Sequence, residues 1–344
     1  MNIPGSRRRF WIGLRGVAFG VLAALAGGAL PVESWAQEAA TERTTLILVV
    51  GAAGDEEFGR AFQESARRWE QAGTNAGARL ITIGVGSNAP ASDRERFQQA
   101  LAQESKDGTA ELWLVLIGHG TFDGREAKLN LVGADISATE LAEWVKPFHR
   151  PMAVINTASA SAPFLAKLSG TNRIIITATR SGHEVNFTRF GGLLSGTLAD
   201  PGADLDKDGQ TSLLEAFLAA ARRTAEFYEG EDRLATEHAL IDDNGDGLGT
   251  PPEWFRGVRA IKRAKDGALP DGLRAHQFHL VRRGGDTALP GALRARRDEL
   301  ELAVARLRDM KNSLEAAEYY RRLEVLLVEM AQCYERAEKP EARR

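Results

Sequence analysis

The chain has 344 residues, 43% hydrophobic and 26% charged, which is typical of globular proteins and excludes disordered, collagen-like and multi-span membrane classes. At roughly 100–200 residues per domain, this length predicts two domains or one large domain with an appendage. Lys and Arg total 44 against 47 Asp and Glu, a formal charge of −3, so we expect no nucleic-acid partner. The single cysteine, Cys333, excludes an internal disulfide and a Cys-based zinc site.

The first 36 residues have the pattern of an export signal. Arg7-Arg8-Arg9 is followed by a weakly polar run over 16–30 and by Ser34-Trp35-Ala36, a small-x-Ala cleavage site. The arginines fit a twin-arginine signal or an ordinary secretion signal, and the sequence leaves both open. Cleavage removes four arginines and one glutamate, which changes the charge from −3 to −6. We expect a periplasmic or secreted protein with no stable membrane span after cleavage.

Residues 42–255 are predicted to form an α/β domain. Near-continuous apolar runs predict buried strands at 46–50, 80–85, 112–117, 152–155 and 173–178. Helical stretches at 58–71, 92–104 and 138–147 separate them, and Ser92 with Glu95 and Ser137 with Glu140 match capping boxes. This alternation predicts a three-layer fold with a parallel sheet. Functional residues are then expected at the carboxyl ends of the strands.

Three strand ends carry the candidate residues. Gly118-His119-Gly120 follows the third strand, and its flexible glycines allow close approach of a substrate to the histidine. Small residues over 156–161 follow the fourth strand. The segment 177–184 follows the fifth.

In order and spacing, these three segments resemble the caspase/legumain-like cysteine peptidase family over about residues 45–250. The resemblance rests on Gly118-His119-Gly120, the strand ending at Asn156, and the segment 176–190. It implies a caspase-like domain with His119 as the catalytic histidine. It also implies a nucleophilic cysteine two positions after Asn156, where this sequence has Ala158.

A methyl group cannot be a nucleophile, and Cys333 lies far away in the predicted helical tail, so we expect no cysteine peptidase activity. A serine would need an oriented base and an oxyanion hole. Ser159 or Ser161 acting with His119 is kept as the alternative, an active hydrolase.

A calcium-binding loop is predicted at 204–215. The segment matches the D-x-D-x-D-G-x5-E pattern, and an amphipathic helix is predicted from Leu213 to about Tyr228. Calcium prefers such oxygen ligands, one of them a main-chain carbonyl and one a bidentate glutamate. The expected ligands are Asp204, Asp206, Asp208, Gln210, Ser212 and Glu215.

A second acidic loop at 242–253 is either another calcium loop or a tight acidic turn, and the sequence leaves both open. Pro251-Pro252 interrupts the segment just before the twelfth position. The expected ligands are Asp242, Asn244, Asp246, Leu248, Thr250 and Glu253. The resemblance extends here, because calcium-loop-like insertions accompany this domain in some bacterial proteins of the family.

Residues 256–290 are predicted to be a connector, with a short helix near 257–265 and a strand at 277–282. His276 and His279 lie in this basic stretch, where we expect no carboxylate partner, so they are predicted to be surface residues rather than zinc ligands. Apolar stripes over 291–338, broken at Lys311-Asn312-Ser313, predict a helical hairpin. The hairpin is expected to pack on the domain or to mediate self-association.

The sequence thus supports three functions. The first is an exported, calcium-binding, catalytically silent module that binds a protein or peptide. The second is a hydrolase using Ser159 or Ser161 with His119. The third is a structural or assembly protein that works through its C-terminal helices.

Overall fold

The computed structural model describes residues 43–86, 91–262, 270–283 and 289–338. The predicted export signal over 1–36 lies outside these residues. No helix among the described residues is both long enough and apolar enough to cross a membrane.

A six-stranded sheet forms the centre of the molecule, in the order β2-β1-β3-β7-β8-β9. The first five strands in this order are parallel, and β9 pairs antiparallel to β8. The strands are β1 (Thr45–Val50), β2 (Arg79–Ile83), β3 (Leu112–Ile117), β7 (Met152–Asn156), β8 (Arg173–Thr177) and β9 (Leu240–Asp242). The predicted three-layer α/β fold is confirmed, with the addition of one antiparallel edge strand.

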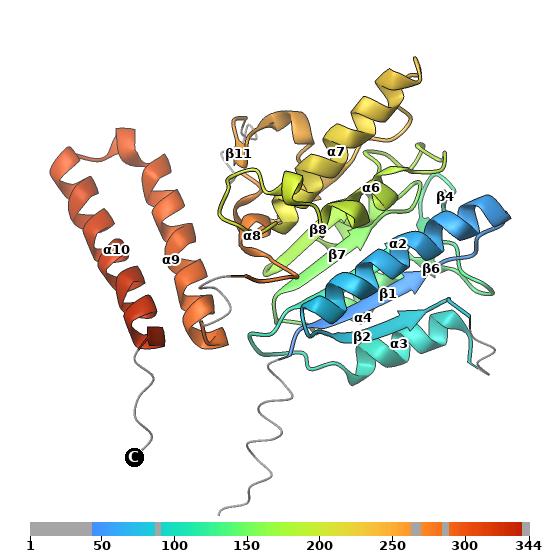
Figure 1. Cartoon of the computed structure of the whole chain (residues 1–344), viewed down its shortest axis with the longest axis horizontal. Coiled ribbons are helices and arrows are strands. Elements are labelled where there is room, and N and C mark those ends of the chain that lie inside the picture. The colour runs from blue at the N-terminus through green and yellow to red at the C-terminus, as the bar shows by residue number, and fades with distance from the viewer. Residues whose placement is uncertain (1–42, 87–90, 263–269, 284–288, 339–344) are drawn as a thin grey trace, which may run out of the picture.

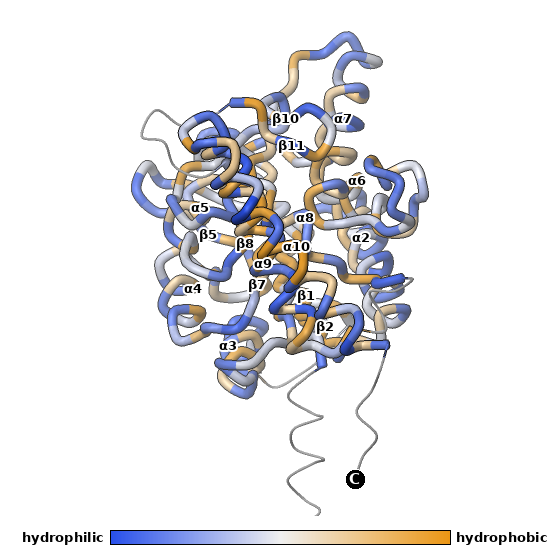
Figure 2. The backbone as a smooth tube through the Cα atoms, turned by 90° about the vertical axis from the view of Figure 1, so that its left-hand side faces the viewer, coloured by the Kyte–Doolittle hydropathy of each residue, from blue (hydrophilic) through white to orange (hydrophobic). Residues whose placement is uncertain are grey.

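Helices cover both faces of this sheet, which explains the unbroken apolar runs in its strands. The helices on one face are α2 (Glu56–Asn75), α6 (Phe190–Thr197) and α7 (Leu213–Gly230). The helices on the other face are α3 (Asp93–Gln103), α4 (Ala138–Val145) and α5 (Ala162–Leu168). Figure 2 shows the hydrophobic segments gathered at the centre of the molecule and hydrophilic ones around them.

Local sequence signals set several of these boundaries. Both predicted capping boxes are present, at Ser92 before α3 and at Ser137 before α4. A third, from Ser212 to Glu215, begins α7. A small sheet of β4 (Gly120–Phe122), β5 (Ala127–Leu129) and β6 (Ile136–Ser137) joins β3 to α4.

The connector differs from the prediction. A two-stranded hairpin of β10 (Phe255–Arg256) and β11 (Arg259–Ala260) occupies the start of the predicted helix, whose last residues lie outside the described part. The predicted strand at 277–282 is also wrong. The short helix α8 (Leu273–Gln277) ends there, and the following residues extend without a ladder partner among the described residues. Residue propensities predicted the wrong elements here, because the conformation of this segment depends on its packing against α7 and β3.

The helical hairpin is confirmed. Helices α9 (Gly291–Asp309) and α10 (Ala316–Glu338) pack against each other, with a short 3-10 helix at Lys311–Ser313 between them. In Figure 1 the hairpin stands beside the α/β domain, next to α8.

Candidate functional site

The three candidate strand ends meet at one edge of the sheet. The strands that precede them, β3, β7 and β8, are adjacent and parallel. Main-chain hydrogen bonds from Thr157 N–H to Leu116 O and from Ala178 N–H to Asn156 O continue the pairing into the loops. The sequence therefore identified the correct edge.

His119 lies in an aromatic setting on the α2 side of this edge. Its ring contacts Phe58 and Phe62 edge to face, with centroid distances of 4.8 and 5.2 Å, and Phe187 lies 6.2 Å away. Its Nε2 is 3.2 Å from the carbonyl oxygen of Ala53. These contacts hold the imidazole against α2 and the loop after β1.

Ala158 lies in the core on the other side of the sheet. It is 1% exposed and belongs to the cluster that contains Leu129 and Phe164, whereas Phe62 belongs to the opposite cluster. Its N–H donates to Asn156 Oδ1 at 3.0 Å. The position implied for a nucleophile is therefore occupied by a packed methyl group.

Both candidate serines are bound to main-chain groups. Ser159 Oγ accepts from Gly120 N–H at 3.0 Å and donates to Gly120 O at 3.1 Å. Ser161 Oγ accepts from the N–H groups of Ala178 and Thr179 and lies 3.2 Å from Thr179 Oγ1. Among the described residues, no hydrogen bond joins either hydroxyl to His119. The geometry gives neither serine the adjacent base that a nucleophile needs.

The close approach of these two loops depends on glycine. A Cβ atom at Gly120 would lie 2.2 Å from the carbonyl oxygen of Ser159. The glycine after His119 therefore brings the β3 and β7 loops into contact.

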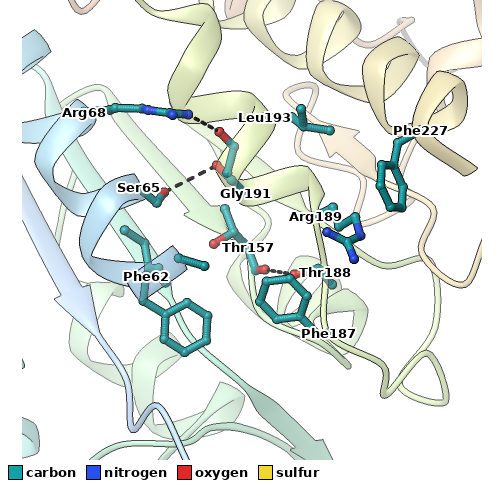
Figure 3. Close-up of a pocket in the computed structure, with 13 residues that line it drawn as sticks. Phe62, Ser65, Arg68, Thr157, Phe187, Thr188, Arg189, Gly191, Leu193 and Phe227 are labelled. Carbon is teal, nitrogen blue, oxygen red and sulfur yellow. Dashed lines mark hydrogen bonds between the residues drawn. The ribbon is translucent and has the colours of Figure 1, made fainter. Parts of the chain in front are cut away.

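A cavity of about 260 Å³ opens beside His119, between α2 and α6 (Figure 3). Phe62, Phe187 and Phe227 line it together with Thr157 and Arg189. No sequence motif marks this cavity. Its residues come from α2, the end of β3, the loop after β7, the segment 187–189, α6 and α7, and no local motif connects them.

The first acidic loop is folded around its own carboxylates. Asp204 accepts from the N–H groups of Lys207 at 2.7 Å and Gly209 at 3.1 Å. Glu215 Oε1, from the first turn of α7, accepts from the N–H groups of Leu205 and Asp206. Carboxylate oxygens that lie within 4.8 Å of one another come from Asp204, Asp206 and Asp208.

The other predicted ligands of this loop have varied surroundings. Ser212 is buried, and its Oγ donates to Glu215 Oε2 at 2.8 Å in the capping box. Gln210 accepts a hydrogen bond from Arg283 N–H through its side chain, which leaves its carbonyl as the candidate ligand. The expectation that His276 lacks a carboxylate neighbour is wrong, because its Nε2 lies 3.0 Å from Asp206 Oδ2. His279 is buried rather than on the surface.

The second acidic loop repeats the hydrogen-bonding pattern of the first. Its first residue, Asp242, accepts from Gly245 and Gly247, which are in the fourth and sixth positions, as Asp204 does in the first loop. Asn244 accepts from Asp246 N–H, and Asp246 from Leu248 N–H. The sixth residue of both loops is a glycine with positive φ, +90° at Gly209 and +75° at Gly247, as the sharp turn requires.

The twelfth position of the second loop is filled from outside the loop. Asp271 Oδ1 accepts from the N–H groups of Asp243 and Asn244, the second and third residues, and these are the bonds that Glu215 makes in the first loop. Its Oδ2 accepts from Thr250 Oγ1. The predicted ligand Glu253 instead lies exposed in a 3-10 helix at Pro252–Trp254. Pro251-Pro252 redirects the chain, so Asp271 replaces Glu253 in this role.

Three buried carboxylates gather at this second loop. Burial raises the pKa of Asp242 and Asp243, and burial together with the charge of Asp243 raises the pKa of Asp271 to about 8. The ionised forms therefore lack a compensating positive charge. Asp271 lies 28 residues beyond Asp243, and no spacing rule for a continuous loop could have identified it.

No protein-family model and no curated protein matches the sequence. Among solved structures, the chain is similar to the Drosophila initiator caspase Dronc, with 13% identity, 59% of this chain and 80% of that chain covered, and a TM-score of 0.39. Protein GSU0716 from Geobacter sulfurreducens is 14% identical, with 58% and 92% covered and a TM-score of 0.39. Caspase-1 from Spodoptera frugiperda is 10% identical, with 59% and 87% covered and a TM-score of 0.39. Two of the three are caspases, and similarity at this level assigns neither a family nor an activity to this chain.

Proposed function

We propose that the chain is an exported, calcium-binding, non-catalytic module of caspase/legumain-like type that binds a protein or peptide. The observation that carries the proposal is the repeated hydrogen-bonding pattern of the two acidic loops. Each presents oxygen groups at its first, third and fifth positions and a carboxylate, Glu215 or Asp271, against its second and third residues.

The donor set fits calcium better than a transition metal. Carboxylate, amide and carbonyl oxygens are hard ligands, and calcium accepts six to eight of them in flexible geometry. The first loop would bind it through Asp204, Asp206 and Asp208, which form one close group, and through Glu215, which forms a second close group with Asp206 and His276. The second would bind it through Asp242, Asn244, Asp246 and Asp271. A divalent cation there would favour the ionised forms of the buried carboxylates.

The candidate catalytic residues support a non-catalytic role. Ala158 is packed in the core, and the hydroxyls of Ser159 and Ser161 are bound to main-chain groups. Cys333 is buried in α10, far along the chain from His119. A thiol- or serine-directed activity probe should not label the wild type, and labelling that disappears in His119→Ala would overturn this part of the proposal.

Export and calcium binding support each other. The N-terminal pattern over 1–36 is that of an export signal. Extracellular calcium modules typically bind with a Kd of about 10⁻⁴–10⁻³ M. Fusing residues 1–36 to a reporter that is active only outside the cytoplasm tests export, and an inactive, uncleaved reporter would contradict it.

Calcium titration by isothermal calorimetry tests the metal sites. We expect two sites in the wild type and one in Glu215→Gln, since glutamine keeps the capping-box geometry and loses the charge. Glu226→Gln, on the same helix outside the loop, is the matched control and should retain both sites. Absence of heat and of thermal stabilisation at millimolar calcium would refute calcium binding.

An exposed apolar stripe on α10 favours self-association as a second candidate function. Tyr320, Leu327 and Tyr334 are spaced seven residues apart, and Tyr320 is 59% and Leu327 48% exposed. Helical residues at this spacing lie on one face. Leu327→Glu should reduce a dimer to a monomer in light scattering, whereas Val132→Glu, at an exposed site on the α/β domain, should not. A monomeric wild type at 100 μM would remove this candidate.

A further inference from the structure

We propose that the cavity between α2 and α6 binds an aromatic or branched apolar side chain carried next to a free carboxylate, the C-terminal residue of a peptide. The peptide source of this group rests on the proposed function. The side chain and carboxylate are inferred from the cavity itself.

The apolar part of the ligand follows from the walls. Phe62 and Phe187 form one side and Phe227 and Leu193 the other (Figure 3). The volume of about 260 Å³ is below the range of about 300–1,000 Å³ usual for drug-sized ligands. The cavity therefore fits one large side chain with its main-chain atoms.

Two buried hydroxyls define a hydrogen-bond acceptor site. Ser65 Oγ donates to Gly191 O at 3.4 Å, and Thr157 Oγ1 donates to Leu116 O at 2.9 Å. A hydroxyl has one hydrogen to donate and two lone pairs. Because both hydrogens are used, the two groups can only accept, so they suit the N–H group of a ligand.

Arg189 supplies the positive charge at the mouth of the cavity. Its guanidinium lies over the ring of Phe227 at 4.1 Å and is 6.0 Å from Phe187. The side chain is exposed, and within the described part of the chain its guanidinium takes part in no hydrogen bond. The planar guanidinium can accept a carboxylate through two parallel hydrogen bonds.

Of the charged residues near the cavity, Arg189 is the one placed to bind a carboxylate. Arg68 also lines the cavity, but its guanidinium is bound to Glu64 and to Gly192 O. The buried Glu237 carboxylate already accepts from Arg189 N–H, Phe190 N–H and Tyr228 OH. The charge of Arg189 also favours the ionised form of Glu237, but the hydrogen bonds to Glu237 come from main-chain and phenol donors, so the N–H groups of the Arg189 guanidinium remain for a ligand.

Two phenylalanines connect the cavity to His119, which does not itself line it. Phe62 and Phe187 line the cavity and also pack on the imidazole ring. An aromatic ligand between them would change the ring currents at His119. The histidine therefore offers a spectroscopic signal that responds to binding at this cavity.

N-acetyl-L-phenylalanine, its amide, and the peptides Ala-Ala-Ala-Phe with a free or amidated C-terminus serve as probes. Each is titrated into the full mature chain while the imidazole signals are followed by NMR, with His119→Gln identifying the signal of His119. We expect saturable shifts of the His119 signal with both free carboxylates. The amides should bind about 10-fold more weakly or not at all, because they lose the charge-assisted bond to Arg189.

Two variants and one control test the location. Gly192→Leu places a side chain at the cavity, where a Cβ meets no atom within 4 Å, and should abolish the shifts. Gly230→Leu is the matched control, since it also lies in a helix with no atom near its Cβ and is not among the residues that line the cavity. Arg189→Gln should bring the affinity of the carboxylates down to that of the amides.

The outcomes separate this inference from the proposed function. Failure of both free carboxylates to shift His119, or unchanged binding in Gly192→Leu, overturns the cavity site and leaves calcium binding untouched. Equal binding of acids and amides overturns the assignment of Arg189. Binding of N-acetyl-L-phenylalanine without binding of the peptide supports the cavity and contradicts the peptide source.

Discussion

Replacing Asp271 by asparagine should stabilise the metal-free protein and remove the calcium response of the second loop. Asparagine is nearly isosteric with aspartate. Its oxygen can accept from the N–H groups of Asp243 and Asn244, and its NH₂ group can donate to Thr250 Oγ1. The loop can therefore keep its hydrogen bonds while one buried negative charge is removed.

The direction in the metal-free protein follows from proton linkage. Asp271 is 3% exposed, and burial raises its pKa to about 8, well above its value in the unfolded chain. Between about pH 4 and pH 8 the folded state retains a proton that the unfolded state has lost, so stability falls as pH rises. At about 1.4 kcal/mol per pKa unit, the penalty at pH 7 is at most about 4 kcal/mol. Since the amide is still buried, we expect Asp271→Asn to recover about 1–3 kcal/mol.

Calcium should cancel or reverse the stability advantage of Asp271→Asn. A ligand at 100 times its Kd stabilises the folded state by about 2.7 kcal/mol per site, so two sites give the wild type about 5 kcal/mol. Asp271→Asn should gain only the stabilisation from the first loop, about 2.7 kcal/mol. Urea unfolding at pH 7 with EDTA or with saturating calcium measures both effects.

Glu253→Gln is the matched control for this experiment. It lies at the twelfth position counted along the sequence but is exposed, so it should leave both stabilities unchanged. A full calcium gain in Asp271→Asn together with a reduced gain in Glu253→Gln would refute the assignment of Asp271. Equal pH dependence of wild type and Asp271→Asn without metal would refute the electrostatic reasoning.

Three further predictions concern the strand-end residues and the hairpin. Ala158→Cys should react slowly with thiol reagents and cleave no peptide, because the side chain is packed away from His119; rapid labelling in the folded state would contradict this. Ser161→Ala should destabilise the fold by about 2–4 kcal/mol in urea unfolding, because it leaves two buried N–H groups without their acceptor. A loss below about 0.5 kcal/mol would be inconsistent with these bonds. Burial raises the pKa of Asp298 to about 6, so the free energy of unfolding should fall by at most about 3 kcal/mol as pH rises from about 4 to 6. Asp298→Asn should lose this pH dependence, which unfolding curves at pH 4.5 and 7 measure.

Local patterns predicted much of the α/β domain because its strands and helices carry their own signals. The five parallel strands are near-continuous apolar runs, and the capping boxes at Ser92 and Ser137 mark where helices begin. The connector lacked such signals. Its hairpin at 255–260 and helix α8 are short elements whose form depends on the surfaces they contact.

The sequence likewise predicted some parts of the candidate site and not others. The first acidic loop is continuous in sequence, so its carboxylates and Gly209 could be recognised by spacing. The sequence also placed His119 and Ala158 at the same edge of the sheet. It could not show that their side chains pack into different cores, because that depends on the direction in which each loop leaves its strand.

The sequence by itself determined the alternating α/β pattern, the absence of a thiol at the strand end, and the first acidic loop, since each is a property of neighbouring residues. Only the tertiary structure assigned Asp271 to the second loop, bound Ser159 and Ser161 to main-chain groups, and assembled the cavity from Phe62, Thr157 and Arg189. These contacts join residues far apart in the chain. They form because the packing of the sheet and its helices brings those residues together, which no local spacing records.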